Sequence, residues 1–353
     1  MRRDKTVKVF IKLLVWVSLS IILQCMGLYF LEQRVFKYTV DFETKSLELD
    51  KDKDKIEENN ATIPEEAENI SISYNGSYLT YSLYGKLYVE DIKNGDKKEI
   101  ITEDKGDILY YKWLSDRDRI IIAEKITNNN IDVIQLSTYN AKDRSQIVVR
   151  TICNYEKNMQ VNKISASVLT GVYYIDVYKG GKKSVVYRVD RNDRLTKLTL
   201  RANILGNMEV IPREDRLIYE DEITNEFYIT NPESRLEFNS NRNLALLGIN
   251  QEGIVFVGEL DGEKVSSIIY GKLSEKTSNW KKIELESVVK RDEIYFNEKN
   301  EILVNDNLQG KIKNLMTNAE IEYDGNLIEI KEDFIATISN SGELKYINLE
   351  ETE

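Results

Sequence analysis

The sequence predicts an all-β fold, a β-propeller of about seven blades that follows a single N-terminal transmembrane helix. Three observations support this prediction. Short runs of alternating apolar and polar residues are separated by turns rich in Gly, Asn and Asp. The same arrangement returns at intervals of roughly forty residues, a spacing that also permits six or eight blades. The composition favours strands, because the chain has 21 Tyr but only 3 Pro among its 353 residues.

Residues 9–31, "VFIKLLVWVSLSIILQCMGLYFL", are predicted to form the transmembrane helix. Lys12 is the only charged residue of this run, whose length as a helix is roughly the 30 Å thickness of a bilayer core. The basic residues of segment 1–8 are expected to stay in the cytoplasm by the positive-inside rule. The protein is therefore expected in the cell membrane, single-pass, with its N-terminus cytoplasmic and its C-terminal domain extracytoplasmic.

Two other interpretations of this segment stay open. A cleaved signal peptide has a shorter apolar run that ends in small residues, whereas this run continues through Met26, Leu28 and Phe30. The letters "ILQC" before Cys25 are like a bacterial lipoprotein box, but Gln24 stands where that motif has a small residue. A retained helix is therefore the main prediction.

Residues 32–69 are predicted to form a charged stalk. The stretch "DFETKSLELDKDKDKIEENNATIPEEAEN" is dense in charge and nearly free of aromatic residues, a composition that does not sustain a core. In the early part of residues 32–69, "RVFKYTVDFE", apolar and polar residues alternate weakly. A strand added to the main domain is therefore an alternative there. The propeller itself is predicted over residues 70–353.

The clearest repeat begins at "ISISY", which alternates and ends at the hairpin signal Asn75-Gly76. "SYLTYS" alternates again, and a turn near Tyr84-Gly85 leads into "KLYVED". The turn at residues 94–96 then leads into "KKEII". Four short antiparallel strands in about thirty-five residues match the size of one propeller blade.

Six further units have the same arrangement. One sheet cannot cover both of its faces, so packing the units round a ring is expected to bury them against one another. Either "LKYINLE" near the C-terminus or "YTVDFE" in the stalk is expected to complete the last blade, and a pair of β-sandwiches is the alternative architecture. The further units are residues 110–138, 163–190, 208–230, 244–273, 293–315 and 326–349.

The first two units resemble TolB-type, WD40-like repeats, in which a strand enters Trp-Ser-Pro-Asp-Gly and an "LYV-Asp" strand follows. Trp113, Ser115 and Asp116 match the family turn, as do Asn75 and Gly76, but the proline of the motif is absent. The chain is also similar to the propeller domain of dipeptidyl-peptidase IV-type proteins. The resemblance implies a propeller from about residue 66 onwards. The peptidases' hydrolase domain, with its Gly-x-Ser-x-Gly elbow and histidine, has no counterpart here.

The composition excludes several kinds of site. The chain has no histidine, which rules out a Ser-His-Asp triad, a Cys-His dyad and a histidine-ligated zinc. Its formal net charge of -11 argues against a broad grip on nucleic acid. No disulfide is expected between Cys25 and Cys153, because Cys25 lies in the apolar N-terminal segment and Cys153 lies far away in the predicted propeller. No catalytic residue, cofactor or metal ligand is therefore predicted, and the protein is not expected to be an enzyme.

A few groups of residues have side chains that could serve in catalysis or ligand binding. Each group also has a structural explanation. Adjacent carboxylates are possible acid–base pairs, but neighbours on a strand point to opposite sides. Oxygen-rich turns resemble calcium loops without the spacing of an EF-hand. A lysine-rich hairpin suits an anionic polymer, and clustered tyrosines suit recognition or packing. These groups are Glu220–Asp221 and Glu214–Asp215; residues 116–119 and 305–310; Lys179 to Lys183; and Tyr81, Tyr84 and Tyr88.

The predicted function is a noncatalytic protein-binding or scaffolding module at a bacterial cell envelope. Its partner is expected to be a protein at the membrane or cell wall that contacts the loop-rich top or bottom of the propeller, with the bilayer contacted through residues 9–31. Two other classes stay open. One is an enzyme that acts on wall glycan or peptide through carboxylates. The other is a ligand-sensing accessory subunit of a membrane complex.

Overall fold

The computed structural model describes residues 12, 15–24, 26 and 28, and then residues 59–102, 106–181, 183–297 and 299–349. The chain divides into two compact units, Met1–Lys55 and Ile56–Glu353. In the first unit the described residues are helical, and the helix exposes large apolar side chains such as Trp16 and Leu23. Within the described residues, no helix has both the length and the apolar character that a membrane crossing requires. The predicted span 9–31 is only partly described.

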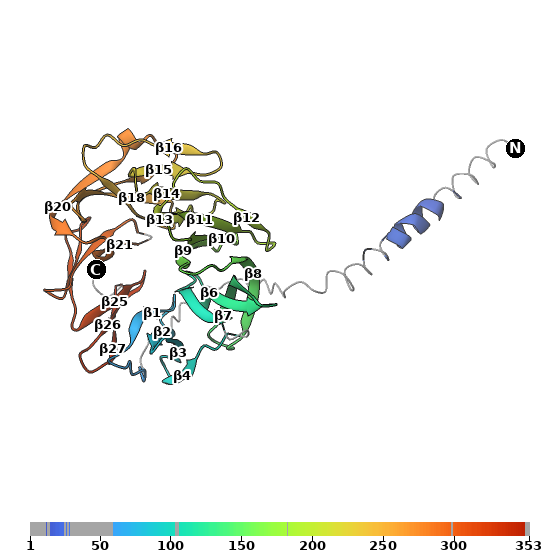
Figure 1. Ribbon diagram of the computed structural model, residues 1–353, viewed down its shortest axis with the longest axis horizontal. Helices are drawn as coiled ribbons and strands as arrows, with labels where there is room; N and C mark the ends of the chain where they lie inside the picture. The colour runs from blue at the N-terminus through green and yellow to red at the C-terminus, as the bar shows by residue number, and fades with distance from the viewer. Residues whose placement is uncertain are drawn as a thin grey trace. The chain divides into compact units, whose positions relative to one another are not determined.

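The second unit is a ring of seven sheets, which confirms the predicted all-β propeller and its blade number. Six sheets have four antiparallel strands in sequence order, and the seventh has three. The blades follow one another in sequence order round the ring (Figure 1). Each predicted unit lies in a blade of its own, so the alternating runs and turn signals located the repeats correctly.

The described strands of the first four blades are as follows. Blade 1 has β1 (Glu68–Ile72), β2 (Tyr78–Leu83), β3 (Lys86–Asp91) and β4 (Asp96–Glu99); blade 2 has β5 (Asp107–Trp113), β6 (Arg119–Asn128), β7 (Ile131–Asn140) and β8 (Gln146–Asn154); blade 3 has β9 (Gln160–Ser167), β10 (Val172–Tyr178), β11 (Ser184–Val189) and β12 (Leu195–Lys197); blade 4 has β13 (Leu205–Val210), β14 (Leu217–Asp221), β15 (Glu226–Ile229) and β16 (Ser234–Leu236).

The remaining blades include two short 3₁₀ helices. Blade 5 has β17 (Leu244–Ile249), β18 (Ile254–Asp261), β19 (Lys264–Lys272), η2 (Thr277–Asn279) and β20 (Lys281–Val289); η3 (Arg291–Glu293) precedes blade 6, with β21 (Ile294–Phe296), β22 (Ile302–Asp306), β23 (Lys311–Asn314) and β24 (Glu320–Glu322); blade 7 has β25 (Asn326–Ile330), β26 (Phe334–Ile338) and β27 (Leu344–Asn348).

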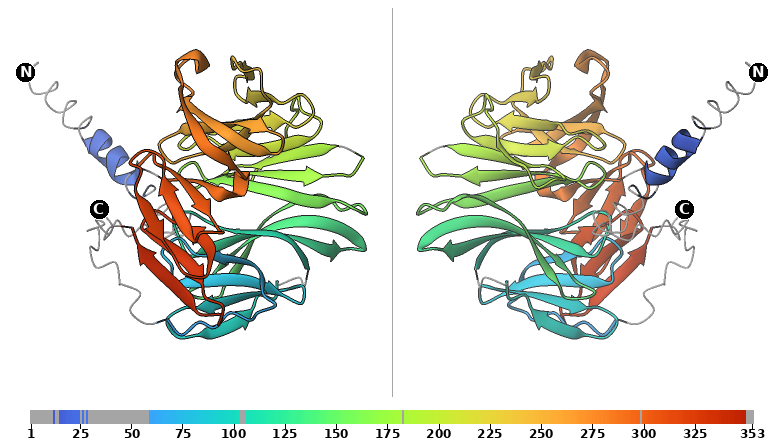
Figure 2. Two further views of the ribbon diagram at one scale, coloured as in Figure 1. Left: turned by 90° about the vertical axis from the view of Figure 1, so that its left-hand side faces the viewer. Right: turned by 90° about the vertical axis from the view of Figure 1, so that its right-hand side faces the viewer.

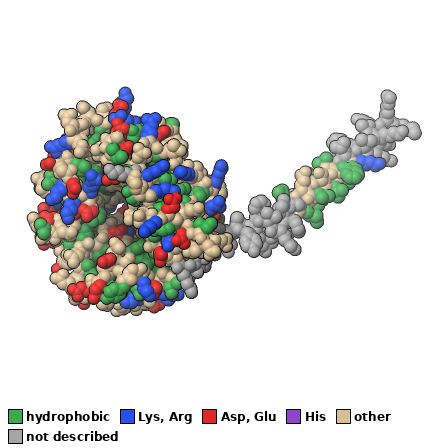
Figure 3. Space-filling model, in the orientation of Figure 1, with side chains coloured by type: hydrophobic (Ala, Val, Ile, Leu, Met, Phe, Trp, Pro, Cys, Tyr) green, Lys and Arg blue, Asp and Glu red, His purple; other side chains and the backbone are tan. Residues whose placement is uncertain are grey.

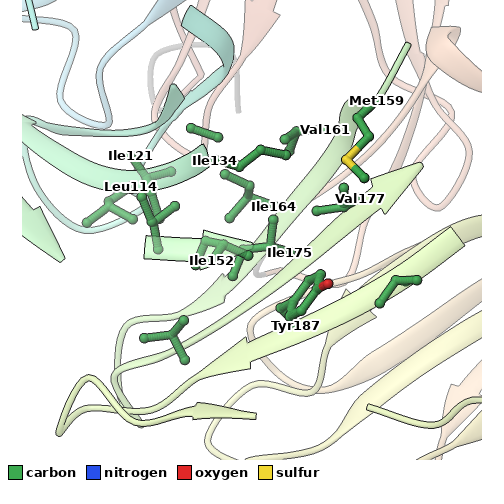
Figure 4. Packing of buried hydrophobic residues seen from close by; sticks show 14 residues of the cluster. Leu114, Ile121, Ile134, Ile152, Met159, Val161, Ile164, Ile175, Val177 and Tyr187 are labelled. Carbon is green, nitrogen blue, oxygen red and sulfur yellow. The ribbon is translucent and has the colours of Figure 1, made fainter. Parts of the chain in front are cut away.

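The core consists of apolar layers between neighbouring blades. The layer between blades 2 and 3 joins Ile121 and Ile134 of one sheet to Ile164 and Ile175 of the next (Figure 4). Ile134, Ile164 and Ile175 are fully buried, and burying one such side chain contributes about 1.5–3 kcal/mol to folding. Each sheet therefore depends on its neighbours, because one face of every blade is covered by the next blade.

The innermost strand of most blades carries a β-bulge that the sequence did not predict. The pairing register with the second strand slips on β1, β5, β9, β13, β17 and β25. A bulge adds one unpaired residue, increases the local twist and turns a side chain in a new direction. At Asn162 and Asn207 the bulge leaves an amide side chain free to contact groups near the ring centre.

The ring closes with segments from both ends of the domain. The stretch predicted near "LKYINLE" forms β27, the third strand of blade 7. Residues 59–63, which belong to the predicted stalk, lie beside β27 through a bridge from Thr62 to Glu343 and bury Ala61 and Ile63. They take the place of a fourth strand, so the ordered ring starts before residue 70. The other closure candidate, "YTVDFE", lies outside the described residues.

Candidate binding surfaces of the ring

The strand order gives the ring two different faces. The first strand of each blade lies nearest the centre and the last lies at the rim (Figure 1). The strands run between the two faces (Figure 2), and neighbours are antiparallel. The hairpins between second and third strands and the connections between blades therefore end on one face, here called the hairpin face. The other turns end on the opposite face.

The ring centre holds a polar cluster made by blades 3 and 4. The Lys163 ammonium lies 2.5 Å from Glu209 Oε1 and donates to Asn207 Oδ1 at the same distance. Ser165 Oγ donates to Glu209 Oε2 at 2.9 Å and accepts from the Val210 amide at 2.9 Å. The middle of the molecule is hollowed on the face shown in Figure 3. The cluster joins β9 to β13 at that centre.

The charges of the cluster keep its carboxylate ionised. Burial by itself raises the pKa of Glu209, but the Lys163 and Lys112 ammonium groups and the Ser165 hydroxyl lower it below its ordinary value. An acid held in this way is a poor proton donor at neutral pH. The arrangement therefore suits the joining of strands better than acid–base chemistry.

Other polar side chains of the innermost strands also join neighbouring blades. Asn207 Nδ2 donates to the Leu246 carbonyl at 2.9 Å, and Asn250 Nδ2 donates to the Asn297 carbonyl at 3.1 Å. Glu329 Oε2 accepts from the Ile72 amide at 3.1 Å, which links blade 7 to blade 1. These polar groups form hydrogen bonds between neighbouring blades. A ligand at the ring centre would have to displace those hydrogen bonds.

The paired carboxylates singled out in the sequence are structural. Glu220 and Asp221 are both buried, and they serve different partners. Glu220 Oε2 accepts from the Leu246 amide at 2.9 Å, whereas Asp221 Oδ1 accepts from the Ile223 amide at 2.8 Å. The neighbouring side chains thus point to different elements and do not form a dyad.

The second pair is also separated. Glu214 pairs with Arg216 at 2.9 Å, while Asp215 accepts from Tyr174 Oη at 2.8 Å and forms an ion pair with Arg188. The Arg188 guanidinium lowers the pKa of Asp215. Both carboxylates are therefore engaged with cations or hydroxyls of their surroundings.

The oxygen-rich turns use their oxygens locally. In residues 116–119, Asp116 pairs with Arg117 at 2.6 Å, and Asp118 Oδ2 accepts from Asn75 at 3.2 Å. In residues 305–310, Asp306 Oδ1 accepts from the Leu308 amide at 3.0 Å. Within the described part of the chain, no three His, Cys, Asp or Glu residues are grouped so that they could hold a metal ion.

The three tyrosines lie in different environments. Tyr81 is fully buried and stacks on Tyr88, with 5.7 Å between ring centroids. Tyr84 occupies the β2–β3 hairpin on the hairpin face and is 80% exposed. Lys179 and Lys183 flank the β10–β11 hairpin on the same face, and Lys183 is exposed. The packing explanation is thus right for Tyr81 and Tyr88, while Tyr84 is available to a partner.

Sequence reasoning missed two kinds of residue. Ile131, Ile223 and Leu308 are exposed at hairpin tips, and each stands within two residues of an Asn or Asp that marks the turn. Asp176 is 2% exposed in β10, and its Oδ1 has no hydrogen-bond partner among the described residues. Burial raises the pKa of Asp176 to about 6. The signal for Asp176 was a lone acid in the apolar run "VYYIDVY".

Comparison with known proteins gives the fold. No family model matches the sequence, and neither does any curated protein. A structure of the mitotic checkpoint complex aligns with a TM-score of 0.53 at 13% identity over 83% of this chain and 90% of the other. One of two prolyl endopeptidases aligns with 0.52 at 12% identity, over 73% of this chain and 42% of the other. The WD40 repeats of RRP9 align with 0.50 at 11% identity, over 80% and 94%.

A TolB from Acinetobacter baumannii also matches, but its TM-score of 0.38 over 63% of this chain is too low to support an argument. The three structural alignments with TM-scores of 0.50 to 0.53 show the fold alone, because the sequence identities are only 11 to 13%. The expected resemblance is confirmed at that level: the chain is a seven-bladed β-propeller similar in fold to WD40 repeat proteins and to a structure of a prolyl endopeptidase.

Proposed function

We propose that this chain is a noncatalytic β-propeller that binds or scaffolds a protein partner, held at a cell membrane by its N-terminal apolar segment. The carrying observation is the contrast between the centre and the surface of the ring. Central polar groups such as Lys163 and Glu209 contact one another, whereas large apolar side chains are exposed at the turns. Apolar groups on a rigid surface favour association with another protein.

The proposal that the chain is noncatalytic is supported by the contacts of its carboxylates. Glu209, Glu220 and Asp215 each hold a backbone amide, a hydroxyl or a cation of this chain. The neighbours in fold include a structure of a protein assembly, the mitotic checkpoint complex. By analogy of fold, that neighbour supports a binding role.

The membrane part is supported by the N-terminal segment. Residues 9–31 contain one charge, and the described helix exposes Trp16 at 71% and Leu23 at 67%. Large apolar side chains exposed along a helix are typical of a surface that protein or lipid covers. The basic segment 1–8 favours a cytoplasmic N-terminus, which would place the ring on the other side of the bilayer.

The anchor is tested by expressing the full chain and a variant without residues 1–31 in bacteria. We expect the full chain to resist extraction from membranes by alkaline carbonate and the variant to be released. Protease added outside intact cells stripped of their wall should digest the ring. A full chain that carbonate extracts, or a ring protected from external protease, contradicts this part.

Protein binding is tested separately by photo-crosslinking in intact cells. A photoreactive residue at Lys183 probes the hairpin face, and one at Tyr74 probes the opposite face. Each stands two residues from a turn glycine and avoids the positive φ of Gly181 (59°) and Gly76 (77°), where a side chain is strained. A reproducible protein adduct at either site supports the proposal. Adducts with wall fragments alone contradict it and favour an interaction with glycan.

A further inference from the structure

The hairpin face carries exposed apolar side chains at four of its seven hairpins. Singly exposed apolar residues are common and need no explanation, but their recurrence at several hairpins of one face is a pattern. On the opposite face the corresponding large residues are Tyr74, Leu169 and Met316, at 42, 71 and 43% exposure. The four on the hairpin face are Tyr84 at 80%, Ile131 at 52%, Ile223 at 58% and Leu308 at 99%.

Turn geometry does not require these residues. Asp221–Asn225 and Asp306–Gly310 are matching turns, in which the Asp side chain accepts amide hydrogen bonds and the fifth residue has positive φ. The third residue of each, Ile223 or Leu308, points into solvent. Asp91–Gly95 on the opposite face has the same features, and its third residue is the exposed Lys93. A lysine therefore suits this position, and the hairpin face has an aliphatic residue instead.

Tyr84 is even less expected. It occupies the first position of a two-residue hairpin with Gly85, and both have positive φ, 51° and 76°. Such turns favour Asn-Gly, because a bulky side chain is strained at positive φ. The ring of Tyr84 gains no burial in return. A strained and exposed aromatic residue is the kind of outlier that accompanies a binding role.

The hairpin face has a local cationic site at blade 3 and exposed acids at blades 4 and 5, namely Glu222, Asp261 and Glu263. Lys179 and Lys183 bound the glycine hairpin of blade 3, and neither is ion-paired with another described residue. An anionic bilayer is disfavoured as the occupant, because Glu222 stands beside Ile223 and the whole chain has a net charge of -11. A protein with separate apolar pockets and one acidic patch suits both features.

We infer that the hairpin face is the docking surface for a protein partner, with Tyr84, Ile131, Ile223 and Leu308 as apolar anchors and with Lys179 and Lys183 opposite an acidic patch. The inference rests on the proposed binding function and specifies the face and the partner's chemistry.

The test places a photoreactive residue at Leu308, at Ile223 or, as the matched site on the opposite face, at Leu169 in the full chain. We expect one protein to be captured from both hairpin positions and not from Leu169. With that protein purified, the double variant Ile223→Lys and Leu308→Lys should weaken binding roughly tenfold or more, whereas Leu169→Lys should leave it unchanged. Because Lys93 occupies the same position in the matching turn, we expect these substitutions to preserve the fold, and unchanged thermal unfolding would verify it.

The acidic patch is tested with Lys179→Glu plus Lys183→Glu, which should lower the association rate and reduce its dependence on salt. Unchanged rates overturn this part of the inference. Capture from Leu169 alone overturns the choice of face but keeps the proposed function. Lipid adducts at Leu308 and Ile223 overturn the protein partner, and the absence of adducts from both faces overturns the proposed function as well.

Discussion

The interface between blades 2 and 3 and the seam between blades 7 and 1 both join neighbouring sheets, but the contacts that join them differ. The first is a continuous apolar layer that includes Ile164 and Ile175. The second adds directional contacts, among them Glu329 with the Ser71 hydroxyl and the Ile72 amide, and a separate segment at residues 59–63. Between blades 2 and 3 the apolar layer is the main contact. At the seam, where distant parts of the chain meet, hydrogen bonds also fix the register.

The largest effect should come from the apolar interface. Ile175→Ala removes three carbons from a fully buried site, and the cavity should lower the free energy of unfolding by about 3 to 4 kcal/mol. Urea unfolding followed by tryptophan fluorescence measures this change. Ile175→Val is the control and should cost about 1 kcal/mol. Equal losses for Val and Ala would mean that packing at this layer is looser than the structure indicates.

An opposite sign is expected at Asp176, where blade 3 buries a carboxylate. Burial raises the pKa of Asp176 from 3.8 to about 6, so between these values the folded chain keeps a proton that the unfolded chain has lost. Its contribution to stability therefore falls as the pH rises through this window, and the full penalty is present above pH 6. A shift of this size corresponds to roughly 2 to 3 kcal/mol.

Asp176→Asn should remove this penalty, because an amide keeps the shape of the side chain and stays neutral. We expect the variant to be more stable than the original chain by about 2 kcal/mol at pH 8 and to differ little at pH 4. Urea titrations at the two pH values measure the difference. A gain that is equal at both would show that the effect comes from hydrogen bonding at Asn162 and not from charge.

The directional contact of the seam should have a smaller effect. Glu329→Ala leaves the Ile72 amide and the Ser71 hydroxyl without their acceptor, a loss of about 1 to 2 kcal/mol. Hydrogen exchange of the peptide that covers β1 should quicken, since the seam opens locally. Glu329→Gln keeps an acceptor oxygen and should lie close to the original chain. If Ala and Gln behaved alike, the seam would be held by its apolar cluster alone.

The sequence predicted the repeated parts of the fold because the strands and turns of each blade depend on residues close together in the chain. The hairpin signals at Asn75-Gly76 and Tyr84-Gly85 stand between alternating runs, and the structure places turns at both. The repeated unit needs no knowledge of the distant chain. Blade number and strand order followed from counting such units.

The seam and the surfaces could not be predicted in the same way. The burial of Ala61 and Ile63 depends on blade 7, almost three hundred residues away, and their charged surroundings are typical of a linker. The bulge at Asn207 also depends on the neighbouring blade, whose carbonyls it contacts. Leu308 gave a weak local signal, because a turn motif does not state which of its side chains a partner will need.

The smallest expected effect belongs to Tyr346, which crosses the seam by a single hydroxyl. Tyr346 Oη donates to the Gly76 carbonyl at 3.1 Å, while its ring packs edge-on against Phe334 with 5.1 Å between centroids. Tyr346→Phe keeps the ring contact and removes only the hydrogen bond, so the loss should be about 0.5 to 1 kcal/mol in a urea titration. Tyr346→Leu, which also removes the aromatic contact, should cost more. If Tyr346→Phe lowered the free energy of unfolding as much as Glu329→Ala, the contact of blade 7 with the β1–β2 turn would matter as much as its contact with β1. The main stabilising contact of the seam would then not be confined to the ring centre.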